Sequence, residues 1–312
     1  MSGFEKPRSD GHPTLLIIAG PTAVGKTALC VRLAKWLNTD IVSADSRQFY
    51  RELSIGTAKP SVEEMQGVRH HFIDSHSISQ YYSAGDFERD CLQLLEELFK
   101  TKEVVILTGG SGMFIKAITD GLDEMPEAPL VLREQLEDRA QKEGLATLVA
   151  ELQQLDPVYY QEVDKQNHQR IVRALEVCLS TGKPFSSFRK SEKIQRPFRM
   201  LKICLNRRRE ELYARIDARM DAMLTQGLVA EVQSLTAYRN HNALQTVGYK
   251  EVFEYLDDTY DYAEMIRLLK RNSRRYAKRQ LTWFRNQDEF VWFEATDEAK
   301  LLEYLDSQRI KS

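Results

Sequence analysis

The segment that most constrains the fold of this chain is Gly20-Pro21-Thr22-Ala23-Val24-Gly25-Lys26-Thr27, which matches G-x-x-x-x-G-K-[ST]. It follows an apolar run of strand length at 14–19 and precedes a segment whose apolar residues have helical spacing. In such a strand–loop–helix unit, backbone N–H groups and the helix N-terminus surround phosphate oxygens. We therefore predict that residues 20–27 bind a di- or triphosphate group, with Lys26 neutralising charge and the Thr27 hydroxyl facing Mg²⁺.

Strand and helix patterns alternate along much of the chain. Besides 14–19, strands are expected at 41–44, 104–107 and 201–205, and long helices at about 209–226 and 261–285. Alternation of this kind predicts a parallel sheet covered by helices on both faces. The expected fold class is therefore α/β, with a P-loop NTPase-like parallel sheet core.

The composition and the hydrophobic pattern of the sequence change after Gly121. The stretch 123–129 (DEMPEAP) is rich in acid and proline, and the residues up to about 190 have helical patterns with few strand signals. We expect an inserted helical subdomain at 123–199. The core would then be formed by 1–122 and 200–312.

Composition limits the location and the partners of the chain. The 312 residues carry 44 Lys and Arg against 46 Asp and Glu, so binding to nucleic acid would require a local basic patch. No apolar run reaches the length of a membrane span or a signal-peptide core. The four cysteines form no C-x-x-C pair, which excludes a standard zinc site and favours a reducing, cytoplasmic location without membrane contact.

Two further segments follow predicted strands. Asp45 comes directly after the strand at 41–44, and an acid at the carboxyl end of a parallel strand lies over the ligand crevice. It is expected to be a metal ligand or a base, unless it caps the next segment. The turn at 108–112 (TGGSG) could bring Ser111 to the same crevice, although an ordinary strand-to-helix turn has the same pattern.

A basic stripe is predicted near the end of the chain. Residues 267–285 contain eight Lys or Arg and no acid, and most of the basic residues share one helix face at spacings of three and four. This face is either a solvated surface or a site for RNA phosphates. Arg215 and Arg219 are further candidates for phosphate contact, with pairing to Glu210 or Glu211 as the alternative.

Taken together, the motifs resemble the tRNA dimethylallyltransferase (tRNA isopentenyltransferase) family over nearly the whole chain. The segments in family order are GPTAVGKT (20–27), DSRQFY (45–50), IGTAKP (55–60), HHFID (70–74), GGSGMF (109–114), QRIVRALEV (169–177), VGYKE (247–251) and RRYAKRQLTWFR (274–285). The resemblance implies transfer of a dimethylallyl group from dimethylallyl diphosphate to N6 of adenosine 37 in tRNA, with release of diphosphate. It also implies that the adenine is flipped out of the anticodon loop into the cleft.

The family's residue roles carry over to matching positions. Asp45 matches the catalytic Asp, which would accept the proton of the amine. Ser111 is the second catalytic residue and replaces the usual Thr, Phe114 replaces a Tyr, and Asn167 replaces an Asp. The residues implied to contact tRNA are Asp45, Ser46, Arg47, Gln48, Gln169, Arg170, Arg173, Gln245, Gly248, Tyr249, Lys250, Arg274, Arg275, Lys278 and Arg279. Mg²⁺ is the implied cofactor, and a monomer of the compact bacterial form, without a zinc finger, is expected.

Three other functions compete with this interpretation. A small-molecule or nucleotide kinase would use the phosphate loop but leave the acid-free basic segment unexplained. A transferase that prenylates free adenine nucleotides would need neither the insertion nor the basic stripe. A non-catalytic RNA-binding protein would need no phosphate loop, no Asp45 and no hydroxyl at position 111.

Overall fold

A computed structural model describes residues 13–190, 193–287 and 289–310, and its contacts divide the chain into two compact units. Unit 1 comprises Met1–Thr119 and Gln195–Ser312, and unit 2 comprises Asp120–Ile194. Unit 2 starts three residues before the insertion predicted at 123–199 and ends five residues before it. Arg196 explains the second boundary, because its guanidinium donates to the carbonyl oxygens of Ala117 and Ile118 within unit 1.

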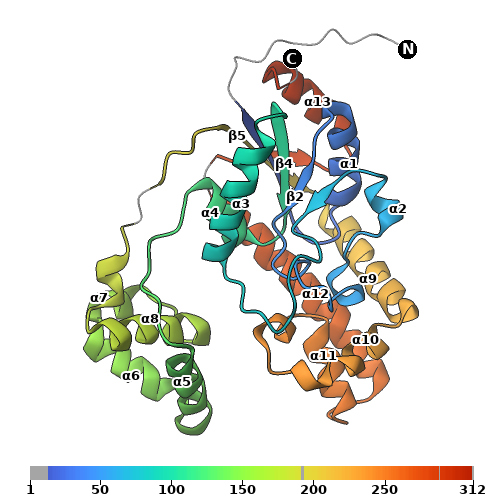
Figure 1. The fold of residues 1–312 in the computed structure, drawn as a ribbon. Helices are drawn as coiled ribbons and strands as arrows, with labels where there is room; N and C mark the ends of the chain where they lie inside the picture. Colours follow the sequence, from blue (N-terminus) through green and yellow to red (C-terminus); the bar gives the residue numbers. More distant parts are fainter. Residues whose placement is uncertain (1–12, 191–192, 288, 311–312) are drawn as a thin grey trace, which may run out of the picture. The chain divides into compact units, whose positions relative to one another are not determined.

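Unit 1 is built on a six-stranded sheet in the order β3-β2-β4-β1-β5-β6, and every strand pair in it is parallel (Figure 1). The strands are β1 (Thr14–Ala19), β2 (Ile41–Ser43), β3 (His70–His71), β4 (Val104–Gly109), β5 (Arg199–Asn206) and β6 (Val291–Glu294). The four strands expected from the sequence are present. The sequence did not predict β3 and β6. These short strands lie at the two edges of the sheet, where a strand is less buried and needs no long apolar run. The predicted α/β class with a P-loop NTPase-like core is confirmed.

Helices cover both faces of this sheet. On one face, β1 residues Leu16 and Ile18 pack in one cluster with side chains of α1 (Lys26–Leu37) and α13 (Glu298–Ser307). On the other, Leu15 and Ile17 share a cluster with α3 (Ala84–Leu98) and α4 (Gly112–Thr119). All four β1 side chains are fully buried, as expected for a central parallel strand.

A second core in unit 1 joins the later helices. Its helices are α9 (Arg209–Gln226), α10 (Leu228–Ser234), α11 (Tyr249–Leu256) and α12 (Tyr262–Arg285). Met265 and Leu269 of α12 pack in this cluster together with Tyr50 and Leu53, which follow β2. The segment after β2 is therefore held by the C-terminal helices. A short helix, α2 (Val62–Met65), follows that segment.

Unit 2 is a small helical body with its own core. Its helices are α5 (Leu130–Glu143), α6 (Leu145–Leu155), α7 (Pro157–Glu162) and α8 (His168–Thr181), followed by a 3-10 turn at Phe185–Phe188. Leu148, Leu152 and Ile171 are fully buried in its centre. The buried carboxylate of Asp156 caps α7 at Tyr159 and accepts hydrogen bonds from Ser186, so it ties the 3-10 turn to the helices.

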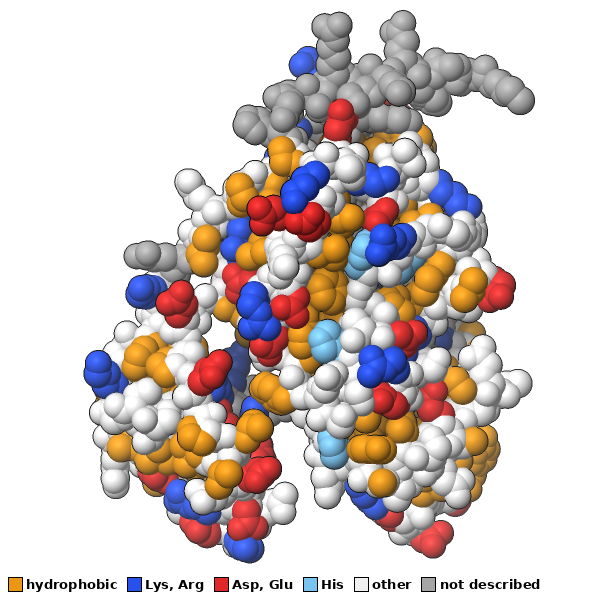
Figure 2. All heavy atoms as spheres, viewed as in Figure 1, with side chains coloured by type: hydrophobic (Ala, Val, Ile, Leu, Met, Phe, Trp, Pro, Cys, Tyr) orange, Lys and Arg blue, Asp and Glu red, His pale blue; other side chains and the backbone are white. Residues whose placement is uncertain are grey.

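Charges of both signs mix on the surface. On the face drawn in Figure 2, Lys and Arg side chains lie among Asp and Glu side chains, in keeping with the net charge of −2. Among the described residues, no helix combines the length and the apolar character needed to cross a bilayer.

Candidate active site

The phosphate loop lies between β1 and α1, where the sequence predicts it. Ala23 (φ 62°) and Gly25 (φ 115°) adopt left-handed backbone conformations, which glycine tolerates most readily. The loop therefore turns sharply before α1 begins at Lys26, with Gly25 as the N-terminal cap. The N–H groups of the first turn of α1 have no partners within the helix, so they are available to an anion.

Lys26 reaches back over this loop. Its ammonium group donates to the carbonyl oxygens of Gly20 and Pro21 at 2.8 and 2.9 Å. Burial lowers the pKa of Lys26 to about 8, with the negative charge of Asp45 opposing the shift and the positive charge of Arg219 adding to it. Because the charges of Asp45 and Arg219 both act on the pKa of Lys26, the three groups lie in one electrostatic environment.

Three arginines from β5 and α9 surround the phosphate loop. Arg215 donates from Nε to the carbonyl oxygen of Ala23 at 2.8 Å, and Arg219 donates to the Thr22 hydroxyl at 3.3 Å. Arg207, directly after β5, donates from Nε to the carbonyl oxygen of Val24 at 2.9 Å. Of the two alternatives for Arg215 and Arg219, the structure favours the phosphate loop over pairing with Glu210 or Glu211. Their guanidinium groups add positive charge where a diphosphate would lie.

Gln280 of α12 connects the phosphate loop to the second glycine turn. Its side-chain oxygen accepts from the backbone N–H of Thr22, and its side-chain nitrogen donates to the carbonyl oxygen of Gly110, both at 2.9 Å. Only 7% of Gln280 is exposed. Sequence reasoning missed this residue, although its position among the buried residues Ala277 and Phe284 marks a polar side chain on an apolar helix face.

Replacing Gln280 by leucine is expected to destabilise the protein by about 1–3 kcal/mol, because a buried N–H and a buried carbonyl lose their partners. The KM for a substrate bound by the phosphate loop should rise as well, since the loop is then free to move. Urea unfolding and steady-state kinetics measure the two effects. Gln226→Leu, at the exposed end of α9, is the matched control. Wild-type stability and KM in Gln280→Leu would contradict the connecting role.

Asp45 and Ser111 lie on neighbouring loops at the carboxyl edge of the sheet. The Ser111 hydroxyl accepts from the backbone N–H of Ser46 at 3.0 Å and lies 3.2 Å from the Ser46 hydroxyl. The loops approach so closely that a Cβ on Gly109 would lie 2.3 Å from the carbonyl oxygen of Ala44. In the strand order, the Ser111 loop after β4 lies beside the phosphate loop after β1, and the Asp45 loop after β2 lies one strand further away.

The Asp45 carboxylate is half-buried and has a local partner. Its Oδ1 accepts from the backbone N–H of Arg47 at 3.0 Å. Asp45 therefore caps the next segment, which the sequence offered as the alternative to a role as metal ligand or base. This bond leaves the second oxygen of the carboxylate for a ligand. Tyr276 of α12 lies close by, since burial together with the charge of Asp45 raises the pKa of Tyr276 to about 12. Burial also lowers the pKa of Arg47.

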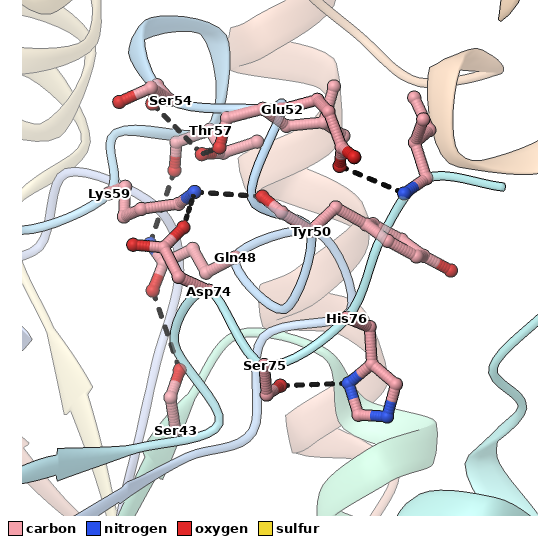
Figure 3. Close-up of polar contacts among 12 residues, drawn as sticks. Ser43, Gln48, Tyr50, Glu52, Ser54, Thr57, Lys59, Asp74, Ser75 and His76 are labelled. Carbon is pink, nitrogen blue, oxygen red and sulfur yellow. Dashed lines mark hydrogen bonds and ion pairs between the residues drawn. The ribbon is translucent and has the colours of Figure 1, made fainter. Parts of the chain in front are cut away.

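The segment after Asp45 is fastened by its own polar side chains (Figure 3). Gln48 donates to the carbonyl oxygens of Thr57 and Ala58, both at 3.2 Å, and Lys59 donates to the carbonyl oxygen of Tyr50 at 2.8 Å. Lys59 also pairs with Asp74, as Figure 3 shows. The amide nitrogen of Gln48 is thus committed to the protein.

Glu231 of α10 holds the start of the IGTAKP segment. Its carboxylate accepts from the backbone N–H groups of Ser54, Ile55 and Gly56 at 2.7–3.2 Å, and from the Tyr249 hydroxyl at 2.6 Å. Tyr249 is completely buried. Its ring packs in the core, and the implied contact of Tyr249 with tRNA stays a prediction. Gly248 is also buried, whereas Gln245 and Lys250 are exposed.

The predicted basic stripe on α12 is only partly available to a ligand. Acids that are distant in sequence neutralise Arg274 and Lys270, which pair with Asp217 and Asp221 of α9. Arg267 pairs with Glu264 of its own helix. Within this stripe, the exposed cations without an acidic partner among the described residues are Arg275, Lys278, Arg279 and Arg285.

Trp283 and Phe284, near the end of the same helix, face inward. Phe284 is fully buried, and Trp283 lies so close to Gly112 that a Cβ there would meet the indole ring at 2.3 Å. Phe114 packs against Phe49 and Phe87 with ring centroids 5.4 and 5.3 Å away. These rings therefore form core contacts and not a base-stacking surface.

In unit 2, α8 carries the remaining candidates. Gln169 and Arg170 are exposed in its first turn, where the Asn167 side chain caps the helix by accepting from the N–H of Arg170. Asn167 thus performs a role for which Asp is also suited. Arg173 instead pairs with the buried carboxylate of Glu176 at 3.1 Å, which gives it a structural partner.

The donor set near the phosphate loop is suited to Mg²⁺ held mainly by phosphates. Mg²⁺ keeps several waters and takes one or two protein oxygens together with substrate phosphates. The Thr27 side chain is exposed at the start of α1. The described residues contain no cluster of three or more His, Cys, Asp or Glu side chains that could hold a metal alone. The exposed Thr27 hydroxyl fits a metal that is held together with phosphate oxygens.

A cation-lined phosphate loop, with a carboxylate and a hydroxyl on the adjacent loops, places this protein in the class of P-loop group-transfer proteins. A family model described as IPP transferase matches residues 48–287, so the chain belongs to this family of transferases. The matched range begins after the phosphate loop.

Relatives and solved structures agree over nearly the full length. The chain is 51% identical over 294 residues to a tRNA dimethylallyltransferase of Cytophaga hutchinsonii, covering 94% of this chain and 97% of the relative. A tRNA dimethylallyltransferase of Bacteroides thetaiotaomicron is 47% identical, with coverages of 96% and 97%. The crystal structure of a tRNA isopentenylpyrophosphate transferase from Bacillus halodurans is 36% identical with a TM-score of 0.69, covering 95% and 96% of the two chains. The resemblance to the tRNA dimethylallyltransferases is thereby confirmed.

Proposed function

We propose that this enzyme transfers a dimethylallyl group from dimethylallyl diphosphate to N6 of adenosine 37 in tRNA, giving N6-isopentenyladenosine and diphosphate. The observation that carries the proposal is the position of Asp45, within the electrostatic range of Lys26 and joined through Ser46 to Ser111. A base and a diphosphate site beside each other are what this reaction requires.

The chemistry would proceed by displacement at the allylic carbon. The N6 nitrogen forms a bond to that carbon, the bond from carbon to the diphosphate oxygen breaks, and the N6 proton passes to Asp45. Lys26, Arg215, Arg219 and the backbone N–H groups of the loop stabilise the negative charge that grows on the leaving diphosphate. Ser111 holds the Asp45 loop in register through Ser46.

Mg²⁺ is proposed as the cofactor, held by Thr27 and the diphosphate oxygens. When bound, it supplies positive charge to the leaving group. The side chains of the protein perform the other steps. Lys26 binds the diphosphate, Asp45 accepts the N6 proton, and Gln280 holds the phosphate loop against the turn at Gly110.

The tRNA would contact both units. In unit 1 the proposed contacts are Ser46, Arg47 and the exposed cations Arg275, Lys278 and Arg279, and in unit 2 they are Gln169 and Arg170. Adenosine 37 must leave the anticodon stack to reach Asp45, so we propose base flipping. We also propose a cytoplasmic monomer, in keeping with four free, buried cysteines.

Mass spectrometry of digested tRNA tests the proposed function. The enzyme is incubated with dimethylallyl diphosphate, Mg²⁺ and a tRNA transcript, and N6-isopentenyladenosine is expected in the nucleoside digest. A transcript with guanosine at position 37 is the matched control. If AMP is prenylated and tRNA is not, the enzyme acts on free nucleotides. If ATP is consumed instead, it is a kinase. Either result overturns the proposal.

Charge removal at Arg275 and Arg279 is expected to weaken tRNA binding, because both side chains are exposed and lack an acidic partner among the described residues. In Arg275→Gln/Arg279→Gln, the slope of log affinity against log salt should fall by about two, one for each lost phosphate contact. Filter binding at several salt concentrations measures the slope. Arg89→Gln, an exposed arginine of α3, is the control. An unchanged slope would mean that these residues form only a solvated surface.

A further inference from the structure

A pocket of about 440 Å³ lies between the start of α9, the C-terminal half of α12 and the end of β6. Its lining contains five cationic side chains and a single carboxylate. The residues that matter for the argument are Arg207, Arg209, Tyr213, Lys278, Arg285 and Glu294. A concave site with this excess of positive charge concentrates anions.

The pocket adjoins the phosphate loop through a shared wall. Arg207 lines the pocket and also donates from Nε to the carbonyl oxygen of Val24. A terminal nitrogen of the same guanidinium lies 3.7 Å from the position that a Cβ on Gly25 would occupy. The guanidinium therefore faces the loop, so one arginine side chain borders both the pocket and the phosphate loop.

The strand order places the pocket on one particular side of the loop. The loop follows β1, the Asp45 and Ser111 loops follow β2 and β4, and the pocket is lined from the ends of β5 and β6. Because β1 lies between β4 and β5, the phosphate loop separates the pocket from Asp45. A ligand in the pocket therefore approaches the phosphate loop from the side away from the base that accepts the proton.

Several of these cations remain able to donate to an anion. Arg207 and Arg208 are not among them, because both pair with the carboxylate of Glu211. Arg209 stacks over Tyr213 at 5.2 Å and Arg285 over Trp292 at 5.9 Å, contacts that use ring faces and leave guanidinium N–H groups free. Two arginines anchored in this way match the planar, bidentate binding of phosphate groups.

We propose that this pocket is a second diphosphate site, which holds the diphosphate group on its way between solvent and the phosphate loop. The inference rests on the proposed function, since it assigns a route to the substrate or product of that reaction. The shared chemistry is a diphosphate, carried either by the arriving isoprenoid or by the free product.

Binding measurements on the full chain test the proposal. Calorimetric titration of the wild-type protein with inorganic diphosphate, and separately with dimethylallyl diphosphate, is expected to show two binding events in at least one titration. Arg209→Gln/Arg285→Gln should weaken the second event at least about tenfold, the effect of one charge-assisted hydrogen bond. Lys26→Ala should weaken the first. Arg89→Gln/Lys300→Gln, on exposed parts of α3 and α13, is the charge-matched control.

The outcomes distinguish a pocket for the arriving substrate from a pocket for the released product. A second event with dimethylallyl diphosphate alone assigns the pocket to the arriving substrate, and one with inorganic diphosphate alone assigns it to the product. Arg209→Lys/Arg285→Lys keeps the charge but loses the bidentate geometry, so it should recover the second event in part, which separates lost charge from misfolding. A single event in both titrations, or a second event that survives Arg209→Gln/Arg285→Gln, overturns the proposal. Because the diphosphate titrations contain no tRNA, they fail or succeed independently of the prenyl-transfer assay.

Discussion

Replacing Asp45 by asparagine is expected to slow prenyl transfer by about 10²- to 10⁴-fold, the usual contribution of a general base. Asparagine keeps a side-chain oxygen for the N–H of Arg47, so the loop should retain its shape. It cannot accept the N6 proton as a carboxylate does. Single-turnover transfer with saturating tRNA and dimethylallyl diphosphate measures the step, and tRNA affinity is expected to stay close to that of the wild type.

The control for this substitution is Asp306→Asn, which removes an exposed carboxylate from α13. Its rate should match that of the wild-type enzyme. If Asp45→Asn also transfers at the wild-type rate, Asp45 is not the base. A fall in tRNA affinity that accounts for the whole loss of rate would instead assign Asp45 to binding.

Replacing Lys26 by alanine should reduce kcat/KM for dimethylallyl diphosphate by about 10²- to 10³-fold, because one preorganised donor to the leaving group is lost. The remaining cations, Arg215 and Arg219, bond to the same loop and should preserve its fold. Initial rates at varied diphosphate concentration provide the measurement. Normal kinetics in the variant would mean that the loop holds something other than the diphosphate.

The pH dependence gives a second test of Lys26. Burial lowers its pKa to about 8, so in the free enzyme the ammonium is present below that pH and is lost as pH rises through it. The KM for the diphosphate substrate should therefore rise above about pH 8. Lys26→Arg keeps its charge over this range and should remove this rise. A wild-type KM that is flat from pH 7 to 9 would contradict the assignment.

The fold was largely predictable because its strongest signals are local. A continuous apolar run makes β1, and the glycines of residues 20–27 require a turn before a helix. By contrast, β3 and β6 are edge strands of two and four residues, and only pairing with β2 and β5 defines them. No pattern within such short segments separates a strand from a loop.

The site was predictable only in part, because several of its residues act through partners that are distant in sequence. Arg274 looks free within its own helix, yet Asp217 of α9 neutralises it. Tyr249 resembles a surface aromatic residue but is buried with its hydroxyl on Glu231. Asp45 and Ser111 were found from the rule that ligands bind at the carboxyl ends of parallel strands, which needs no side-chain partner.

The bond between Thr22 and Gln280 spans 258 positions of the chain, and Arg215 meets Ala23 across 192. During synthesis, therefore, the phosphate loop leaves the ribosome long before the side chains that brace it exist. Contacts of such high separation form late and slowly. A nascent chain that ends before α12 should hold the strand and glycines of a phosphate loop without a working site, so the enzyme becomes competent only when nearly all of it has been made.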